Sequence, residues 1–289
     1  MEQRRIGARQ VSELGYGGMY LSVQGRPAEA QALEALKAVL DGGITLIDTA
    51  DAYCLNDADV GHNERLIAKA LAAAGKSRDE VLVATKGGHT RQPNGGWDVD
   101  GRPEYLRNAC DASLKALGVD VIDLYQYHRP DPKVPYEESI GAVAELQRAG
   151  KVRMVGISNV SLAQLDTAQR LVEVVSVQNE FHQWHRNDEH NGVLQACTER
   201  GIAYLPYSPF GGGSRAKSLG DIAAIAEVAR KHTATPYQIV LAWLLGKSPV
   251  IVPIPCTTRA ERVRENLEAA RLKLSAEDMR AVAEAKPSV

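Results

Sequence analysis

Short apolar runs alternate with helical stretches along the whole chain. The runs are SELGYGG near residue 12, ITLIDTA at 44, VLVATK at 81, VIDLYQYH at 121, VRMVGISN at 152, VVSVQNE at 174, IAYLPYSP at 202 and VIVPIP at 250. Several of them are apolar at consecutive positions, as expected of strands that are buried on both faces. The alternation predicts parallel strands that are joined by crossover helices.

The stretches between the runs carry recognisable helix boundaries. In residues 27–43, PAEAQALEALKAVLDGG, Pro27 suits a first helical turn, the leucines share a face and two glycines end the helix. In residues 102–120, RPEYLRNACDASLKALGVD, Pro103 begins the helix and Gly118 ends it. Residues 138–151 and 235–247 show the same pattern.

Eight strand–helix units in 289 residues have the size of a (β/α)8 TIM barrel. We therefore predict an α/β barrel that forms a single domain over residues 1–289. The alternative is a doubly wound open sheet, but that fold usually carries a GxGxxG turn, and GYGGM matches it only weakly. Residues 4–14, RRIGARQVSEL, are expected to form a short β-hairpin that caps the barrel bottom. The glycine-rich segments RQPNGGWDVDG and PFGGGSRAKSLG are expected to be loops.

Composition and charge narrow the function classes. The chain is 44% hydrophobic and 24% charged, with a net charge of −2, and it has no basic block to suggest a nucleic-acid partner. No apolar run has the length of a membrane span, and the start, MEQRRIGARQ, lacks the apolar centre of a signal peptide. The four cysteines are far apart and form no CxxC pair, so we expect no disulfide, no metal and a cytoplasmic location.

Titratable side chains follow three consecutive apolar runs. Asp48 ends the second run, with Tyr53 just beyond it; Lys86 ends the third and His128 the fourth. Each has an ordinary explanation by itself, as a helix cap, a solvated charge or a structural histidine. In a barrel of this kind, however, the carboxyl ends of the strands meet on the face that holds the active site. Three titratable groups at neighbouring strand ends therefore indicate a common site.

A set of longer motifs connects these residues to a known family. In order, they are LGYGGM, GITLIDTADAY, GHNERLIAKAL, VATK, LGVDVIDLYQYH, GKVRMVGISN, VQNE, YSPFGGG and RVRENL. Together they resemble the aldo-keto reductases over nearly the whole chain. The resemblance implies a (β/α)8 barrel that reduces carbonyl compounds with NADPH. It also implies an Asp-Tyr-Lys-His tetrad made of Asp48, Tyr53, Lys86 and His128.

The chemistry of carbonyl reduction agrees with such a tetrad. Hydride transfer builds negative charge on the carbonyl oxygen, which then needs a proton, and Tyr53 would supply it. We expect the Lys86 ammonium to lower the pKa of this phenol, which is ordinarily about 10. Asp48 would pair with Lys86 and compensate its buried charge, and His128 would donate a hydrogen bond that orients the carbonyl.

The resemblance also implies a nicotinamide site. Ser158, Asn159 and Gln178 supply donors and acceptors for the carboxamide, and Tyr207 would stack on the ring. The remaining positions that we expect to bind the cofactor are Gly17, Gly18, Met19, Asp48, Ser208, Pro209, Phe210, Gly211, Ile254, Pro255, Cys256, Thr257, Thr258, Arg262, Glu265 and Asn266.

The residues expected to bind the adenosine end of the cofactor are less typical of the family. Cys256 stands where relatives often have a lysine or glycine, and such a lysine helps to bind the 2′-phosphate of NADPH. Arg262, Thr257 and Arg259 would then carry this phosphate. We predict NADPH rather than NADH as the cofactor. The alternative is that RAERVRENL is only the solvated start of a helix with paired charges.

The substrate is expected to be a small carbonyl compound. Met19, Tyr20 and Trp97 are the predicted walls of its pocket, together with Tyr53 and His128, and Phe210 is a further candidate. The chain ends at PSV soon after its last helix, which suggests an open site. The layout around VQNEFHQWHRNDE resembles the bacterial branch that includes pyridoxal reductase and pyridoxine dehydrogenase-like members.

Two other functions remain open. One is a non-catalytic, nicotinamide-binding regulatory subunit, and the other is a barrel enzyme that forms a Schiff base on Lys86. We expect a monomer or a weak homo-oligomer.

Overall fold

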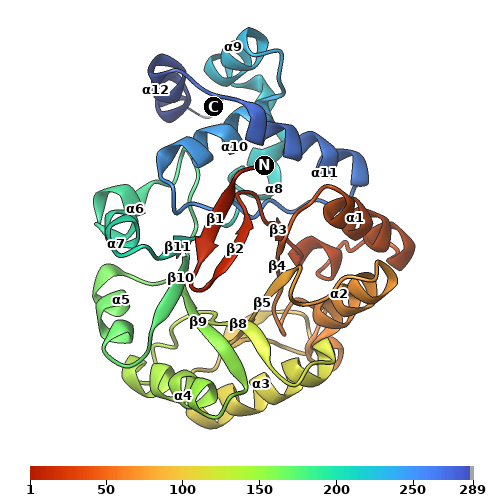
Figure 1. Ribbon diagram of the computed structural model, residues 1–289, viewed down its shortest axis with the longest axis vertical. Helices are drawn as coiled ribbons and strands as arrows, with labels where there is room; N and C mark the ends of the chain where they lie inside the picture. Colours follow the sequence, from red (N-terminus) through yellow and green to blue (C-terminus); the bar gives the residue numbers. More distant parts are fainter. Residues whose placement is uncertain (287–289) are drawn as a thin grey trace.

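The fold is a closed barrel of parallel strands inside a ring of helices, as Figure 1 shows for the computed structural model, which describes residues 1–286. Seven strands form one parallel sheet in the order β11-β10-β9-β8-β5-β4-β3. Their bounds are β3 Tyr16–Gly17, β4 Leu46–Asp48, β5 Leu82–Gly87, β8 Ile122–Tyr127, β9 Val152–Ser158, β10 Val174–Gln178 and β11 Ala203–Tyr204.

Residues 250–255 close the barrel between the first and last strands of this sheet. Ile251 forms a parallel bridge with Tyr204, and on the other side the Gly17 amide donates to the Pro255 carbonyl at 3.1 Å. Pro253 and Pro255 have no amide hydrogen, which explains why this eighth segment forms single bridges rather than a long ladder. The predicted TIM barrel is thereby confirmed.

Helices cover the outside of the barrel. The α-helices are α1 Glu29–Asp41, α2 His62–Ala73, α3 Pro103–Leu117, α4 Tyr136–Arg148, α5 Leu162–Gln169, α6 Asn187–His190, α7 Val193–Arg200, α8 Gly213–Lys217, α9 Ala223–Lys231, α10 Pro236–Lys247, α11 Ala260–Leu267 and α12 Ala276–Glu284. Short 3-10 turns are η1 Met19–Leu21, η2 Asp57–Asp59, η3 Leu219–Asp221 and η4 Glu268–Arg271. Within residues 1–286, no helix is long and apolar enough to cross a membrane.

The four helices that the sequence analysis described correspond to α1, α3, α4 and α10. α3 begins at Pro103 and ends at Gly118, whose φ of 65° suits a glycine at a helix end. The prediction for Pro27 was wrong, because α1 begins two residues later and Ala28 is its N-cap. Pro27 therefore precedes the helix.

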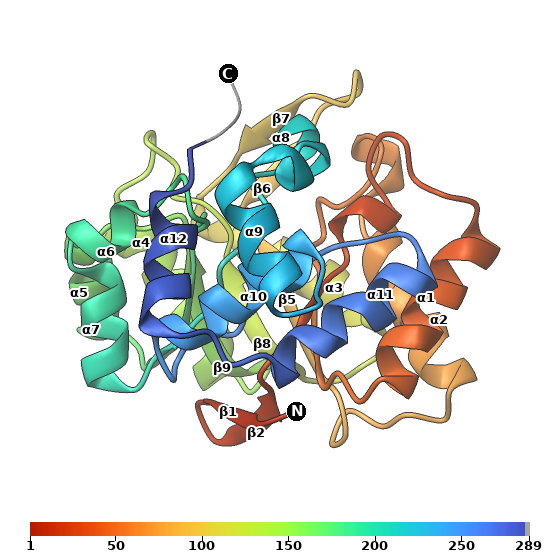
Figure 2. The same ribbon diagram turned by 90° about the horizontal axis from the view of Figure 1, so that it is seen from above.

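A β-hairpin covers one end of the barrel, as predicted. Its strands, β1 Gln3–Ile6 and β2 Arg9–Ser12, pair antiparallel. Figure 2 shows the hairpin at the end opposite to α8. Ile6 and Val11 are buried and join the apolar cluster that fills the barrel interior. The hairpin thus seals the bottom of the core.

The two glycine-rich segments contain regular structure, so their prediction as plain loops was wrong. β6 His89–Arg91 and β7 Trp97–Val99 form a hairpin, and Gly95, with a φ of 80°, lies in its turn. The second segment contains α8 and η3. The β6–β7 hairpin and α8 stand at the end of the barrel away from β1 and β2 (Figure 2). The glycines and the proline of the first segment predicted irregular structure. In the folded protein the proline and the two adjacent glycines lie at the turn of a hairpin that packs on the rim of the barrel.

Alternation along the strands sets what points into the barrel. On β4, Leu46 belongs to the interior cluster and Ile47 to the layer between the sheet and the helices. Asp48 follows with the orientation of Leu46. On β5, Leu82 and Ala84 lie in the interior cluster, and Lys86 continues their face. The apolar barrel interior therefore gives way to charged groups at the carboxyl ends of these strands.

Candidate active site

A cavity of about 590 Å³ opens at the carboxyl ends of the strands. It lies next to the β6–β7 hairpin and α8, since Trp97, Gly213 and Ala216 are among its walls. Most of the predicted site residues line it: Gly17, Met19, Tyr20, Asp48, Tyr53, Trp97, His128, Ser158, Asn159, Gln178, Tyr207, Ser208, Pro209, Phe210, Ile254 and Cys256. The structure thus brings most of the predicted site residues together around one cavity.

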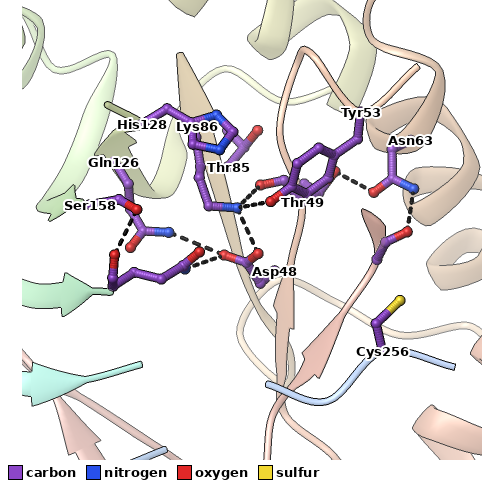
Figure 3. Close-up of polar contacts among 12 residues, drawn as sticks. Asp48, Thr49, Tyr53, Asn63, Thr85, Lys86, Gln126, His128, Ser158 and Cys256 are labelled. Carbon is purple, nitrogen blue, oxygen red and sulfur yellow. Dashed lines mark hydrogen bonds and ion pairs between the residues drawn. The ribbon is translucent and has the colours of Figure 1, made fainter. Parts of the chain in front are cut away.

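Lys86 links Asp48 and Tyr53 beneath this cavity. Its Nζ donates to Asp48 Oδ2 at 2.6 Å, to the Thr49 carbonyl at 2.8 Å and to the Tyr53 hydroxyl at 2.9 Å. Figure 3 shows the lysine between the two side chains. Three acceptors match the three N–H bonds of an ammonium group. Because the Tyr53 oxygen accepts from Lys86, its own proton is free to point elsewhere.

Burial acts on both of these groups. Lys86 is fully buried, and burial lowers its pKa, while the charge of Asp48 opposes that change. The pKa of Tyr53 is raised well above its ordinary value, first by burial and then by the Asp48 charge. The prediction of a lowered phenol pKa was therefore wrong in sign. The sequence predicted the contact between the Lys86 ammonium and Tyr53, but it gave no measure of how deeply the phenol would be buried.

His128 packs against Tyr53. Their rings meet edge to face, with centroids 5.7 Å apart. Burial, followed by the charge of Lys86, holds the pKa of His128 well below its ordinary value. The ring is therefore neutral near pH 7. Its Nδ1 is buried without a partner among the described residues, and the ring lines the cavity.

Asp48 has two further partners that the sequence argument did not assign to it. Gln126 Nε2 donates to Asp48 Oδ1 at 3.1 Å, and Gln178 Nε2 donates to the same oxygen at 2.7 Å. Gln126 was missed altogether, although it lies on the interior face of β8 two residues after Leu124. Each oxygen of the buried carboxylate is thus hydrogen-bonded, which offsets the cost of burying its charge.

Asn159 organises the next part of the cavity wall. It has a φ of 60°, and its Nδ2 donates to the His128 carbonyl at 2.9 Å and to Ser158 Oγ at 3.0 Å. Its Oδ1 accepts from the Tyr207 hydroxyl at 2.8 Å and from Arg129 Nη2 at 3.0 Å. An asparagine tolerates this left-handed backbone better than most residues. The amide, hydroxyl and phenol groups therefore form one polar patch beside the tetrad residues.

Comparison with known proteins decides the family. The family description "Aldo/keto reductase family" matches residues 13–287.

The chain belongs to the aldo/keto reductase family.

Similar proteins agree with this assignment. The chain is 35% identical over 282 residues to pyridoxine 4-dehydrogenase of Escherichia coli, and the match covers 94% of both chains. It is also 35% identical over 306 residues to probable aldo-keto reductase 1 of Glycine max, over 96% of this chain and 86% of that one. It is 32% identical to the aldo-keto reductase yakc [NADP(+)] of Schizosaccharomyces pombe, over 98% of this chain and 90% of that one. A thermostable aldo-keto reductase in complex with the inhibitor epalrestat has a similar structure. Its TM-score is 0.82 at 32% identity, with 98% of this chain and 99% of that chain covered.

Gly17, which ends β3, and Gly18, which follows it, have packing roles. A Cβ on Gly17 would lie 2.9 Å from the Ile254 carbonyl, and one on Gly18 would lie 2.6 Å from Asn63 Oδ1. Asn63 in turn donates to the Gly18 carbonyl at 2.9 Å and accepts from Thr49 Oγ1 at 2.6 Å. Gly17 lines the cavity, whereas Gly18 does not. The lack of a side chain at Gly18 therefore leaves room for Asn63 rather than for a ligand.

Eight residues that were predicted to bind the cofactor lie outside the cavity wall. Gly18, Gly211, Pro255, Thr257, Thr258, Arg262, Glu265 and Asn266 are not among its walls. Arg262 forms an ion pair with Glu265, and Arg259 pairs with Glu261 at 3.3 Å. Both arginines are at least 40% exposed, so either could exchange its carboxylate for a phosphate. The role of Arg259 and Arg262 in binding the cofactor therefore stays a prediction.

Cys256 connects this region to the cavity. Its Sγ accepts a hydrogen bond from the Tyr20 amide at 3.3 Å, and the side chain lines the cavity. Burial raises the pKa of the thiol to about 12, so it stays protonated at neutral pH. In the position of the usual lysine or glycine, Cys256 therefore adds no charge to the site.

The outer wall of the cavity includes residues that sequence reasoning missed. Met19, Tyr20, Trp97 and Phe210 line it as predicted, and His89, Arg129 and Lys217 line it as well. Arg129 directly follows His128 in the chain, and this adjacency was the available signal. The end of the short tail, residues 287–289, lies outside the described residues.

Proposed function

We propose that the chain, as one domain of residues 1–289, reduces an aldehyde or ketone to an alcohol with NADPH. The observation that carries this proposal is the contact of the Lys86 ammonium with both Asp48 and the Tyr53 hydroxyl at the base of the cavity. This arrangement matches what carbonyl reduction needs, namely a protonated acid next to a fixed positive charge.

The donor set at the cavity fits a nicotinamide. Ser158, Asn159 and Gln178 present hydroxyl and amide groups at adjacent strand ends, and the Tyr207 ring lies beside them. Asn159 and Tyr207 are bonded to each other at 2.8 Å, so a carboxamide would take over part of this contact. When bound, the nicotinamide supplies the hydride for the reaction.

The side chains then have separate roles in moving the proton. Tyr53 donates its phenolic proton to the carbonyl oxygen as negative charge develops there. The Lys86 ammonium stabilises the phenolate that remains, and Asp48 holds that ammonium in place. Neutral His128, with its proton on Nε2, donates a hydrogen bond to the same carbonyl oxygen and fixes its direction. The products would be an alcohol and the oxidised nicotinamide, and the phenolate of Tyr53 would regain its proton from solvent.

The geometry of Lys86 disfavours the Schiff-base alternative. A Schiff base needs an unprotonated and accessible amine, whereas Nζ is fully buried and donates to three acceptors. Among the described residues, no cluster of three or more histidines, cysteines or carboxylates could hold a metal ion.

NADPH is proposed over NADH on the basis of positive charge near the adenosine-side segment. Arg259 and Arg262 flank the start of α11, and both are exposed enough to meet a 2′-phosphate. The yeast relative with NADP(+) in its name supports the same choice.

The test is oxidation of NADPH by the purified protein with a panel of aldehydes and ketones, with NADH in parallel. We expect Tyr53→Phe to lower kcat by about 100-fold or more, since general acid catalysis contributes about 100- to 10,000-fold. Tyr53→Phe should bind NADPH as the parent does, as measured by quenching of protein fluorescence. Full activity in Tyr53→Phe, or no binding of NADPH by the parent protein, would show that the proposal is wrong.

A further inference from the structure

The cavity contains a positive charge that neither the fold nor the tetrad requires. Arg129 lines the cavity wall next to His128. Its Nε donates to His89 Nε2 at 3.0 Å and its Nη2 donates to Asn159 Oδ1 at 3.0 Å. Both acceptors are neutral, and Arg129 forms no ion pair with a carboxylate among residues 1–286. The guanidinium is therefore held in place without being neutralised.

His89 is suited to holding the arginine without cancelling its charge. Burial, followed by the Arg129 charge, lowers the pKa of His89 to about 4, so the imidazole is neutral at pH 7. Its Nε2 is then free to act as an acceptor. The ring also packs against Trp97, with centroids 5.3 Å apart, which fixes it on the wall of the β6–β7 hairpin.

The remaining charges of the cavity do not offset Arg129. Asp48 is the only carboxylate among the described residues that line it, and Asp48 is paired with Lys86. The other basic side chain on the wall is Lys217, at the end of α8. The rest of the wall is largely apolar or aromatic. An anion that enters this cavity would thus meet a positive charge that no carboxylate on the wall offsets.

The arginine lies close to the position of the reacting carbonyl. The rings of His128 and His89 are 4.4 Å apart between centroids, and the Arg129 Nε contacts His89. The Arg129 guanidinium lines the cavity and also contacts the Tyr207 hydroxyl. A substrate whose oxygen is bound by Tyr53 and His128 could therefore reach this group with a substituent of a few atoms.

We propose that Arg129 forms an anion subsite, and that the enzyme prefers aldehydes or ketones that carry a carboxylate or phosphate group. This inference rests on the proposed carbonyl reductase function and adds the substrate class to it. An arginine fork binds both anions through charge-assisted hydrogen bonds. The guanidinium would also orient the substrate, because an anion bound to it directs the carbonyl toward Tyr53.

The test compares matched pairs of substrates at saturating NADPH. One pair is 4-carboxybenzaldehyde and its neutral methyl ester, and the other is glyceraldehyde 3-phosphate and glyceraldehyde. The measured quantity is the ratio of kcat/KM for the anionic and the neutral member. We expect Arg129→Gln to lower this ratio by about 10- to 100-fold in at least one pair, the value of a charged hydrogen bond. The affected pair distinguishes a carboxylate from a phosphate.

Two further variants serve as controls. Arg129→Lys keeps the charge but lacks the fork, so we expect an intermediate ratio. Lys133→Gln removes the same charge from an exposed position on the same loop, outside the cavity wall, and should leave the ratio unchanged. Added salt should lower the preference of the parent enzyme, since Arg129 is exposed.

The outcomes separate this proposal from the one on which it rests. Reduction of neutral aldehydes, with a ratio that changes less than about twofold in Arg129→Gln, would overturn the anion subsite and leave the reductase function intact. If the parent reduces no carbonyl compound at all, both proposals fail. Unchanged circular dichroism and thermal melting of Arg129→Gln would show that the variant is folded.

Discussion

At the scale of single residues, a buried carboxylate and a buried ammonium depend on each other. Asp48 and Lys86 are both almost fully buried, and such a pair is stable only when the remaining hydrogen-bonding groups have partners. Gln126 and Gln178 complete the partners of Asp48, and the Thr49 carbonyl completes those of Lys86. A strand that ends in a carboxylate is therefore explained by the ammonium on its neighbour.

The same pair makes the pH dependence of the reaction testable. Burial lowers the pKa of Lys86 and raises that of Tyr53, so on raising the pH Lys86 loses its proton first. The reductase rate should fall along an alkaline limb below the ordinary lysine value of about 10.4. Asp48 raises the pKa of Lys86, so Asp48→Asn should move this limb to lower pH. The measurement is the pH profile of kcat for each protein.

A surface variant controls for general effects of charge. Asp111→Asn removes an exposed carboxylate that pairs with Lys151, and it should leave the alkaline limb in place. Thermal melting at each pH would confirm that the proteins are folded in the range compared. A limb that stays in place or moves to higher pH in Asp48→Asn would contradict the assignment to Lys86.

At the scale of elements, glycine has opposite effects in a strand end and in a helix. Gly18 follows β3, and a Cβ there would lie 2.6 Å from Asn63 Oδ1. Gly141 lies within α4, and a Cβ there would meet nothing within 4 Å. The first glycine is therefore required by packing, whereas the second only weakens its helix.

We expect Gly18→Ala and Gly141→Ala to change stability in opposite directions. Gly18→Ala displaces Asn63 and should lower the free energy of unfolding by about 1–3 kcal/mol, through strain and lost buried hydrogen bonds. Gly141→Ala should raise it by up to about 1 kcal/mol, because alanine has the higher helix propensity. Urea denaturation measures both values. The packing explanation is wrong if Gly18→Ala is as stable as the parent.

At the scale of the whole molecule, the two ends of the barrel have separate tasks. The β1–β2 hairpin covers the apolar end, and the β6–β7 hairpin and α8 stand at the other (Figure 2). The cavity lies at that second end, since Trp97, Gly213 and Ala216 are among its walls. Ile6 reaches from the hairpin into the interior cluster, where Leu46, Leu82 and Leu124 also lie. The hairpin that seals the core and the proposed active site therefore lie at opposite ends of one barrel, as is general for this fold.

This separation predicts a variant that loses stability without losing activity. Ile6→Ala removes a fully buried side chain and should cost about 2–5 kcal/mol in the free energy of unfolding. The kcat of the folded protein should stay within about twofold of the parent, because Ile6 lies at the far end of the barrel. Arg5→Ala, on the exposed face of the same hairpin, should change stability by less than about 0.5 kcal/mol. A large fall in kcat in Ile6→Ala would show that the two ends are coupled.

The sequence by itself determined the barrel and which side chains gather at the carboxyl ends of its strands. Each apolar run and each helix is encoded by residues that are close together in the chain. The alternation of strands and helices can therefore be recognised from the periodicity and spacing of apolar residues. The same period of two that buries Leu46 and Leu82 also directs Asp48 and Lys86 into the barrel. Residues at the carboxyl ends of parallel strands must share a face, so their proximity followed from the order of the elements.

Only the tertiary structure decided the properties that depend on packing between distant segments. The phenol pKa of Tyr53 rises because burial outweighs the nearby ammonium, and burial is a property of the assembled walls. The contact of Gln126 with Asp48 and that of Arg129 with His89 join residues 78 and 40 positions apart. No local pattern encodes such distances, because they arise when the strands close into a barrel and the β6–β7 hairpin folds over its rim.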